Sequence, residues 1–443
     1  NKKNLKDYYG AIADLNKAIE LNPNNYSGAY YNRGISKREL KDYYGAIADF
    51  TKAIEIDPND AIAYSNRGLS KSYLNNNNGA IVDYTKAIEL DPNYANAYLY
   101  RGDAKSYLNN NNGAIVDYTK AIELDPNNPV AYNNRGNLKN KLKDNNGGIA
   151  DYTKAIELRP NNAETYYNRG LSKSILKDYY GAIADYTKTI ELDPNYADAY
   201  FNRGDAKSYL NNNNGAIVDF TKAIELDPNS AETYYNRGLL KSKLKDYYGA
   251  IADYTKTIEL DPNYADAYFN RGFVKNKLKD NNGAIVDYTK TIELDPNYAG
   301  AYFNRAFSKR KLKDYYGAIA DLNKAIELIP NYANAYLYRG DAKSYLNNNN
   351  GAIADFTKAI EIDPNSAETY YTRGLLKNKL KDNNGAIADY TKAIELDPNY
   401  AVAYNNRGIS KENLGDLTGA CQDGRKAKSL GYDASELING ACN

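Results

Sequence analysis

The sequence predicts an all-α solenoid of about twelve helical hairpins, each 34 residues long, followed by a C-terminal capping helix. Two observations predict this fold. The prolines from Pro58 to Pro398 recur at intervals of 34 residues, apart from an additional Pro129. Between them, a segment close to A-Y-x-N-R-G-x-x-K-x-x-L precedes one close to G-A-I-x-D-Y-T-K-A-I-E-L-D-P-N. A fixed period of this size is typical of a solenoid, in which each repeat buries its apolar face only against its neighbours.

Residues 61–92 illustrate one repeat. The first helix is expected to place Tyr64 and Gly68 on one side, because residues three and four positions apart share a helix face. Asn76 stands where the second helix needs an N-cap, and the equivalent residue is Asp or Asn in every full repeat. Pro92 ends the second helix, since proline disfavours helix at the residue before it and cannot continue the hydrogen-bond ladder.

The repeats resemble the tetratricopeptide repeat (TPR) family, in a subtype similar to bacterial and particularly cyanobacterial members. The residues that stand at the spacings of its motif are Tyr64, Gly68, Ala80, Tyr84, Ala87 and Pro92. The resemblance covers nearly the whole chain and implies a right-handed superhelix. Two positions depart from the family pattern, because Arg67 replaces a usual leucine and Lys71 a usual tyrosine.

The repeat boundaries divide the chain into three parts. Residues 1–26 form an incomplete N-terminal repeat, residues 27–432 form twelve full TPR repeats, and residues 433–443 form the capping helix and tail. A cap is expected at the end of a repeat array, since the terminal apolar face has no neighbour to cover it.

An arginine and an aspartate recur as a pair, as Arg67 and Asp83 do in the repeat described above. In an antiparallel hairpin these side chains fall at the same level and on the same flank. The sequence therefore predicts a semi-buried ion pair in each repeat, with a structural role.

Composition argues against several classes of function. Lys and Arg together number 57 and Asp and Glu 56, whereas nucleic-acid-binding proteins normally carry a basic excess. No run of 18 apolar residues is present to span a membrane. The chain has no histidine, the commonest general base and metal ligand, and no phosphate-binding loop or metal-spaced cluster. We therefore expect no nucleic-acid partner, no membrane span, no cofactor or metal, and no catalytic residues.

A ladder of asparagines is the first candidate binding feature. It is expected on the inner, concave face, which the first helices line. Asparagine both donates and accepts hydrogen bonds, so a ladder can bind the backbone of an extended peptide. The alternative is a solvated surface that hydrogen-bonds the neighbouring helix. The candidate ladder residues are Asn66, Asn134, Asn168, Asn202, Asn236, Asn270 and Asn304.

Aspartate and tyrosine side chains in three nearly identical repeats are the second candidate feature. In each repeat the two residues lie one helical turn apart. Such aromatic grooves suit apolar peptide anchors or sugar rings, although tyrosines also simply pack between helices. The pairs are Asp103 with Tyr107, Asp205 with Tyr209 and Asp341 with Tyr345, and Tyr100 is a further candidate on the same concave face.

The chain contains two cysteines, and both lie near its C-terminus. Cys421 lies on the last second helix, where the cap should dock, and Cys442 follows the cap. The interpretation we favour is a disulfide that tethers the cap, and such a bond would favour an extracytoplasmic or secreted location. The alternative is two buried free thiols in a cytoplasmic protein.

The sequence thus favours a non-enzymatic scaffold that binds an extended segment of a protein or peptide partner in its concave groove. The alternative is a structural protein that self-assembles end to end into a filament, as a head-to-tail homo-oligomer. Carbohydrate binding in the aromatic groove is a third and weaker hypothesis.

Overall fold

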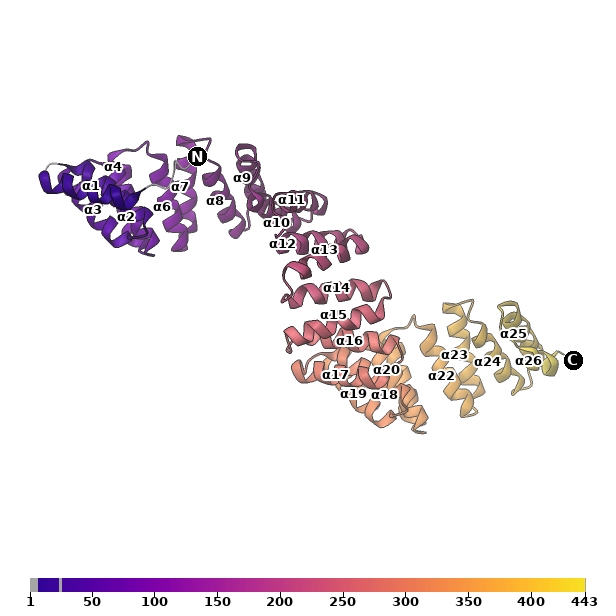
Figure 1. The fold of residues 1–443 in the computed structure, drawn as a ribbon. Helices are drawn as coiled ribbons and strands as arrows, with labels where there is room; N and C mark the ends of the chain where they lie inside the picture. The colour runs from indigo at the N-terminus through magenta and orange to yellow at the C-terminus, as the bar shows by residue number, and fades with distance from the viewer. Residues whose placement is uncertain (1–6, 24–25, 443) are drawn as a thin grey trace. The chain divides into compact units, whose positions relative to one another are not determined.

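The computed structural model describes residues 7–23 and 26–442, and in these ranges all regular secondary structure is helical (Figure 1). The chain forms two compact units, Asn1–Pro228 and Asn229–Asn443. No change in the 34-residue period marks the boundary between them. Each compact unit is a stack of helical hairpins, as the sequence predicts.

The first compact unit contains the second helix of the incomplete repeat, α1, and then six hairpins. The bounds of its helices are α1 Tyr8–Leu21, α2 Ser27–Glu39, α3 Tyr43–Ile56, α4 Ala61–Tyr73, α5 Asn77–Leu90, α6 Ala95–Tyr107, α7 Asn111–Leu124, α8 Pro129–Lys141, α9 Asn145–Leu158, α10 Ala163–Ile175, α11 Tyr179–Leu192, α12 Ala197–Tyr209 and α13 Asn213–Leu226. Of the incomplete N-terminal repeat predicted for residues 1–26, residues 1–6 and 24–25 lie outside the described residues.

The second compact unit contains six further hairpins and a short final helix. The bounds of its helices are α14 Ala231–Lys243, α15 Tyr247–Leu260, α16 Ala265–Lys277, α17 Asn281–Leu294, α18 Ala299–Lys311, α19 Tyr315–Leu328, α20 Ala333–Tyr345, α21 Asn349–Ile362, α22 Ala367–Lys379, α23 Asn383–Leu396, α24 Ala401–Glu412, α25 Leu417–Ser429 and α26 Ser435–Ala441. Among the described residues, no helix combines the length and the apolar character that crossing a membrane requires.

The second helix of each repeat begins at the predicted N-cap. The Asn76 side chain accepts a hydrogen bond from the backbone N–H of Gly79 at 3.0 Å, and Asp416 does the same for Gly419 at 2.9 Å. These acceptors satisfy one of the N–H groups that the first helical turn leaves unpaired. The helix bounds therefore follow from local sequence.

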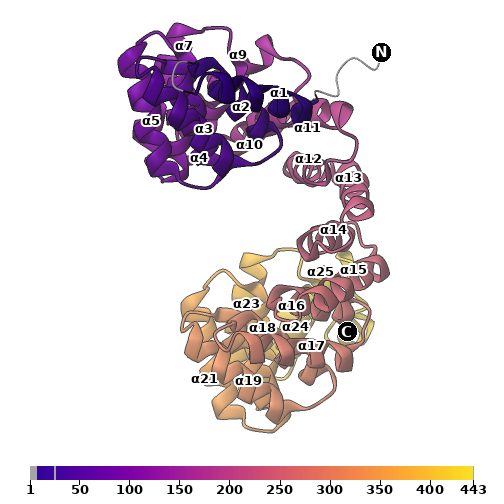
Figure 2. The ribbon, with the colours of Figure 1, turned by 60° about the vertical axis from the view of Figure 1, so that its left-hand side comes forward.

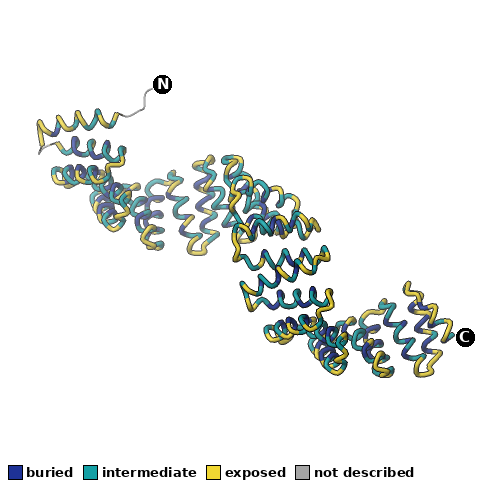
Figure 3. The backbone as a smooth tube through the Cα atoms, turned by 60° about the horizontal axis from the view of Figure 1, so that its bottom comes forward, coloured by how far each residue is buried: buried dark blue, intermediate teal, exposed yellow. Residues whose placement is uncertain are grey.

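Close packing within each hairpin explains the recurrent glycine of the first helix. A Cβ atom added to Gly68 would lie 2.9 Å from the ring of Tyr84 on the second helix. The one repeat that has alanine at this position, Ala306, has Leu322 instead of an aromatic ring opposite, and the two belong to one buried cluster. Small residues thus allow a large buried side chain to lie between the helices. Buried residues, dark blue in Figure 3, recur from hairpin to hairpin along the chain.

A buried ion pair joins the two helices of each of the twelve repeats, which confirms the sequence prediction. Arg203 Nε and Nη2 donate to the two oxygens of Asp219 at 2.9 and 2.7 Å. The third nitrogen, Nη1, donates to Thr187 Oγ1 on the second helix of the preceding repeat. Lys207 Nζ lies 2.7 Å from the same carboxylate, which is only 3% exposed. One aspartate is therefore neutralised by two cations.

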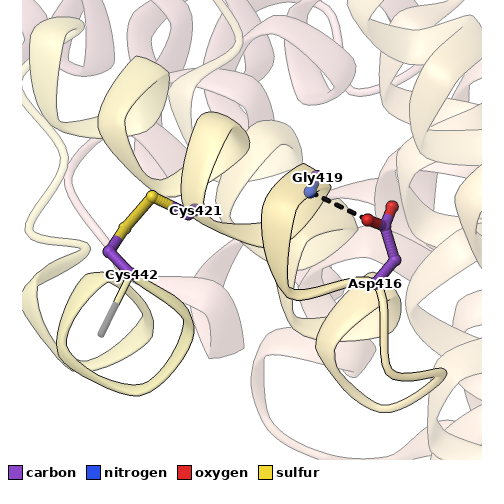
Figure 4. The surroundings of a disulfide bond; sticks show 4 residues. All are labelled: Asp416, Gly419, Cys421 and Cys442. Atoms are coloured by element: carbon purple, nitrogen blue, oxygen red, sulfur yellow. Dashed lines mark hydrogen bonds between the residues drawn. A yellow bond between two sulfur atoms is a disulfide. The ribbon is translucent and has the colours of Figure 1, made fainter.

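The cap closes the C-terminal end in place of a further repeat. In the last hairpin, Gly424 stands where the other full repeats have an aromatic residue or, in one case, Leu322. Leu437 of α26 fills this space, because a Cβ atom added to Gly408 would lie 2.6 Å from its Cδ2 atom. The structure contains the Cys421–Cys442 disulfide, which ties the end of α26 to α25 (Figure 4).

The ion pair gives a first prediction. Arg203→Ala should destabilise the protein by about 2–4 kcal/mol, because Asp219 then keeps only Lys207 as a partner in a buried position. The double variant with Asp219→Ala should recover part of this loss. Chemical denaturation of the wild type, the two single variants and the double variant measures the coupling free energy between Arg203 and Asp219. This double-mutant cycle should give at least about 1 kcal/mol.

Lys222→Ala is the matched control, since Lys222 pairs with Glu225 on an exposed surface at 3.0 Å. It should leave the free energy of unfolding unchanged within error. Strictly additive effects of the two single substitutions would contradict a coupled pair.

The disulfide gives a second prediction. Its sequence separation is 21 residues, and a loop of this size is worth about 3 kcal/mol in the chain-entropy model. Reduction should therefore loosen α26 first and raise hydrogen exchange at the Cys442 amide, which donates to Ile438 O. The Cys421→Ser/Cys442→Ser variant should exchange rapidly with or without reductant. Unchanged exchange in α26 after complete reduction would show that packing alone holds the cap.

Candidate functional site

The first helices line the inner side of each compact unit. Consecutive first helices contact one another, for example α4 with α6. Helices α16 and α18 do so as well (Figure 2). In the described parts of the chain, consecutive second helices make no such contacts. Helices that approach one another directly lie on the inside of a curved stack. The candidate residues of the sequence all belong to first helices.

The ladder asparagines are half-buried, and five of the seven donate a hydrogen bond to the neighbouring repeat. Asn202 Nδ2 donates to the hydroxyl of Tyr167 at 3.0 Å and to Asp198 O in its own helix at 2.8 Å. Asn270 makes the equivalent bonds to Tyr235 and Asp266. The inter-helix alternative of the sequence analysis therefore accounts for the amide N–H groups of Asn202 and Asn270. Their carbonyl oxygens remain as groups that could bind a peptide, whereas that of Asn66 accepts a hydrogen bond from Arg38 Nη1 at 2.5 Å.

Other ladder members vary this arrangement. Asn66 Nδ2 donates to the hydroxyl of Tyr31 at 3.2 Å. Asn134 and Asn168 donate to Asp103 and Asn137 at 2.9 and 3.2 Å, so each is also tied to the first helix before its own. Asn236 and Asn304, the remaining two members, are half-buried on α14 and α18.

The three Asp–Tyr repeats differ in what their tyrosines contact. Tyr209 and Tyr345 stack on tyrosines at the start of the preceding second helix, Tyr179 and Tyr315, with ring centroids 4.7 Å apart in both cases. Asn77 occupies the corresponding position before Tyr107. As a result, Tyr107 is 78% exposed, compared with 59% for Tyr209 and 60% for Tyr345.

Two adjoining hollows lie beside Tyr107 and Asp103, with volumes of about 420 and 310 Å³. The larger lies between α4 and α6, and the smaller extends to α8. The sequence-predicted residues Tyr100, Asp103, Tyr107 and Asn134 meet here. The lining of the larger hollow is Leu69, Ser72, Tyr73, Asn75, Asn77, Tyr84, Tyr100, Asp103, Ala104 and Tyr107.

Asp103 is the only carboxylate among these lining residues. Burial raises its pKa above the ordinary value, while hydrogen bonds from Tyr118 and Asn134 oppose the rise. Both donors bind the same atom, Oδ1, at 2.7 and 2.9 Å. The equivalent Asp341 is instead ion-paired with Arg310, and Asp205 is half-buried on α12.

Sequence reasoning missed one residue of this region, Ser72, whose small side chain leaves room for the larger hollow. The signal was available, because α6 and α20 have the same sequence while the preceding first helices carry Ser72 and Arg310 respectively. Among the described residues, no group of three or more potential metal ligands gathers in one place.

Protein-family models described as TPR or tetratricopeptide repeats match nearly the whole chain. The model described as "TPR repeat" matches residues 73–106, 102–143, 136–173, 204–245, 340–380 and 377–415. Models described as "Tetratricopeptide repeat" match residues 2–25, 27–60, 163–196, 185–217, 231–264, 265–298 and 299–332. No curated protein matches the chain.

Several solved structures are similar to parts of the chain. MamA is 29% identical over 39% of this chain and 94% of its own, with a TM-score of 0.37. YrrB, described as a TPR protein with an unusual peptide-binding site, is 28% identical over 44% of this chain and 97% of its own, with a TM-score of 0.39. Yeast Tom70 is 19% identical over 94% of each chain, with a TM-score of 0.37.

The tyrosines that bind an asparagine of the next repeat, Tyr167 and Tyr235, predict that the folded protein loses stability at alkaline pH. Burial, together with the nearby Asp198, raises the pKa of Tyr167 to about 12, and burial raises that of Tyr235 to about 12. A raised pKa means that the folded state favours the neutral phenol. The associated stability is fully present below pH 10, the ordinary tyrosine value, and is lost as the pH rises from 10 to 12.

Thermal unfolding between pH 8 and 12 checks this expectation, with absorbance at 295 nm to follow phenolate formation. Tyr167→Phe/Tyr235→Phe should flatten the loss of stability above pH 10, because two of the shifted groups are removed. Titration of all 47 tyrosines in one step near pH 10 with full retention of helicity would contradict the prediction.

Proposed function

The chain belongs to the tetratricopeptide repeat family, and from this premise we propose that it is a non-enzymatic scaffold that binds an extended segment of a partner protein along its first helices. Such repeats build surfaces for protein–protein interaction. The observation that carries the proposal is the coincidence of the two hollows, the exposed Tyr107 and the asparagine ladder on one inner face of the first compact unit.

Unpaired acceptors on this face support an extended ligand. Asn134, Asn168 and Asn202 lie on the consecutive first helices α8, α10 and α12, and the Nδ2 atom of each donates a hydrogen bond within the protein. No donor in the described part of the chain pairs with their Oδ1 atoms. An extended backbone presents N–H groups of the kind that such acceptors bind, whatever its side chains.

The aromatic side chains supply a means of anchoring. Tyr73 and Tyr107 are exposed by 56% and 78%, and both line the larger hollow. Rigid aromatic side chains bury a large area at low entropic cost, as in many binding surfaces. The asparagine side chains can accept hydrogen bonds from a peptide backbone, and the hollow can take one of its side chains. Together these features suit a peptide better than a sugar, which would leave Asp103 without a cationic partner.

End-to-end assembly is the second candidate function, and the cap argues against the C-terminal end as a joint. Leu437 and Ala441 of α26 are 4% and 6% exposed, so this end already buries its apolar face within the chain. Light scattering after size exclusion separates the two functions. Particles of 49.5 kDa favour the scaffold, whereas rods that grow with concentration favour the filament.

The ladder gives a fourth prediction. A peptide selected from a library of unstructured segments for binding to the wild type should bind the Asn134→Ala/Asn168→Ala/Asn202→Ala variant about tenfold to a hundredfold more weakly, because up to three hydrogen bonds are lost. Fluorescence anisotropy of the labelled peptide measures this change.

The matched control replaces three exposed asparagines on the second helices of the same compact unit, Asn112, Asn146 and Asn214, by alanine. This control should bind the peptide as the wild type does. Equal affinities for both triple variants, with helicity retained, would remove the ladder from the binding surface.

A further inference from the structure

Two first helices, one in each compact unit, have the same sequence. Helices α6 and α20 both read ANAYLYRGDAKSY, so they present identical side chains, including Tyr100 and Tyr338 and the carboxylates of Asp103 and Asp341. The first helix that precedes each of them differs. Helix α4 carries Ser72 at the position where α18 carries Arg310.

In the second compact unit, the side chain of Arg310 lies against Tyr338 and Asp341 of α20. Its Nη1 atom donates to Asp341 Oδ2. Its guanidinium carbon lies 4.6 Å from the ring centroid of Tyr338 and 5.5 Å from that of Phe307. The arginine and aspartate side chains are only 19% and 22% exposed. The chain itself therefore shows how this helix binds a guanidinium, by one ion pair and by stacking on tyrosine.

In the first compact unit the same space is a hollow. Ser72 is too short to reach Asp103, and the space of about 420 Å³ is lined by Ser72, Tyr100, Asp103 and Tyr107. Asp103 Oδ1 is occupied by Tyr118 and Asn134. Its Oδ2 atom, which corresponds to the one that Arg310 binds in the other repeat, accepts no hydrogen bond from the described residues.

We propose that the hollow between α4 and α6 binds the guanidinium of an arginine side chain carried by the partner segment. The guanidinium takes the place that Arg310 holds beside α20, with its plane against Tyr100 and its N–H groups on Asp103 Oδ2. This inference rests on the proposed function only for the source of the arginine, since the pocket chemistry is the same for any guanidinium.

The chemistry of the hollow favours arginine over other side chains. A lysine ammonium is compact and strongly hydrated, whereas the planar guanidinium stacks on aromatic rings and donates in a fork. An apolar side chain would bury Asp103 without a counter-charge, which costs free energy. Tyr107 can close over the bound group, because it lacks the stacking partner that holds Tyr345 on Tyr315.

The experiment uses N-acetyl-arginine N-methylamide as the probe and the full chain. Ligand-observed NMR or calorimetry should give one site per chain, with a dissociation constant at least about tenfold lower than that of the uncharged, isosteric citrulline derivative. Ser72→Arg places the arginine of α18 on α4, so it should abolish binding. Arg310→Ser opens the equivalent hollow beside α20, so it should raise the number of sites from one to two.

Circular dichroism confirms that both variants are folded before binding is measured. Equal affinity for the arginine and citrulline probes, or unchanged binding by Ser72→Arg, would overturn the assignment of the hollow. If a library-selected peptide binds the wild type and the Ser72→Arg variant equally, the peptide-binding proposal stands and the arginine pocket is wrong. If the capped arginine binds as expected but no extended peptide does, the pocket stands and the proposed function is wrong.

Discussion

The aspartate buried between the two helices of every repeat constrains the rest of the structure. Such a carboxylate is costly in an apolar interior unless cations neutralise it and donors satisfy its oxygens. Arg203 and Lys207 do both for Asp219, from positions one helical turn apart on the facing helix. Because the guanidinium donates one hydrogen bond to each carboxylate oxygen, the two helices cannot slide past each other without breaking a hydrogen bond.

The same arginine links hairpin geometry to the stacking of repeats. Its remaining nitrogen binds a side chain on the preceding second helix, which is a threonine in most repeats, as Thr187 is for Arg203, and Asn16 or Asn323 in two. The guanidinium of Arg203 also lies 5.6 Å from the ring centroid of Tyr200. Apolar burial supplies most of the driving force but little direction. Directional contacts of the arginine give each repeat a defined register against its neighbour, and this register is repeated along each compact unit.

Because the register is the same in every repeat, the repeats differ in the side chains that vary at equivalent positions. Helices α6 and α20 are identical in sequence, yet Asp103 borders a hollow and Asp341 is ion-paired, because the neighbouring helix supplies Ser72 in one case and Arg310 in the other. Under the proposed function, the unit of recognition is therefore a pair of adjacent repeats. A comparison of single repeats misses this difference.

Features that depend on local geometry or on a fixed offset within one hairpin could be predicted from the sequence. The period, the N-cap at Asn76, the Arg–Asp pairs and the cap with its two cysteines are of this kind, because helix periodicity places their atoms together. Which polar groups remain unpaired depends instead on contacts between repeats, and the three-dimensional structure was needed to find them. The Asn202 amide is occupied by a tyrosine from the repeat before, and Lys207 joins the ion pair that sequence reasoning assigned to two residues. No change in the 34-residue period marks the division into two compact units. Likewise, the hollow beside Asp103 depends on the side chain that the preceding repeat supplies, because this contact lies between repeats and the pattern of a single repeat does not encode it.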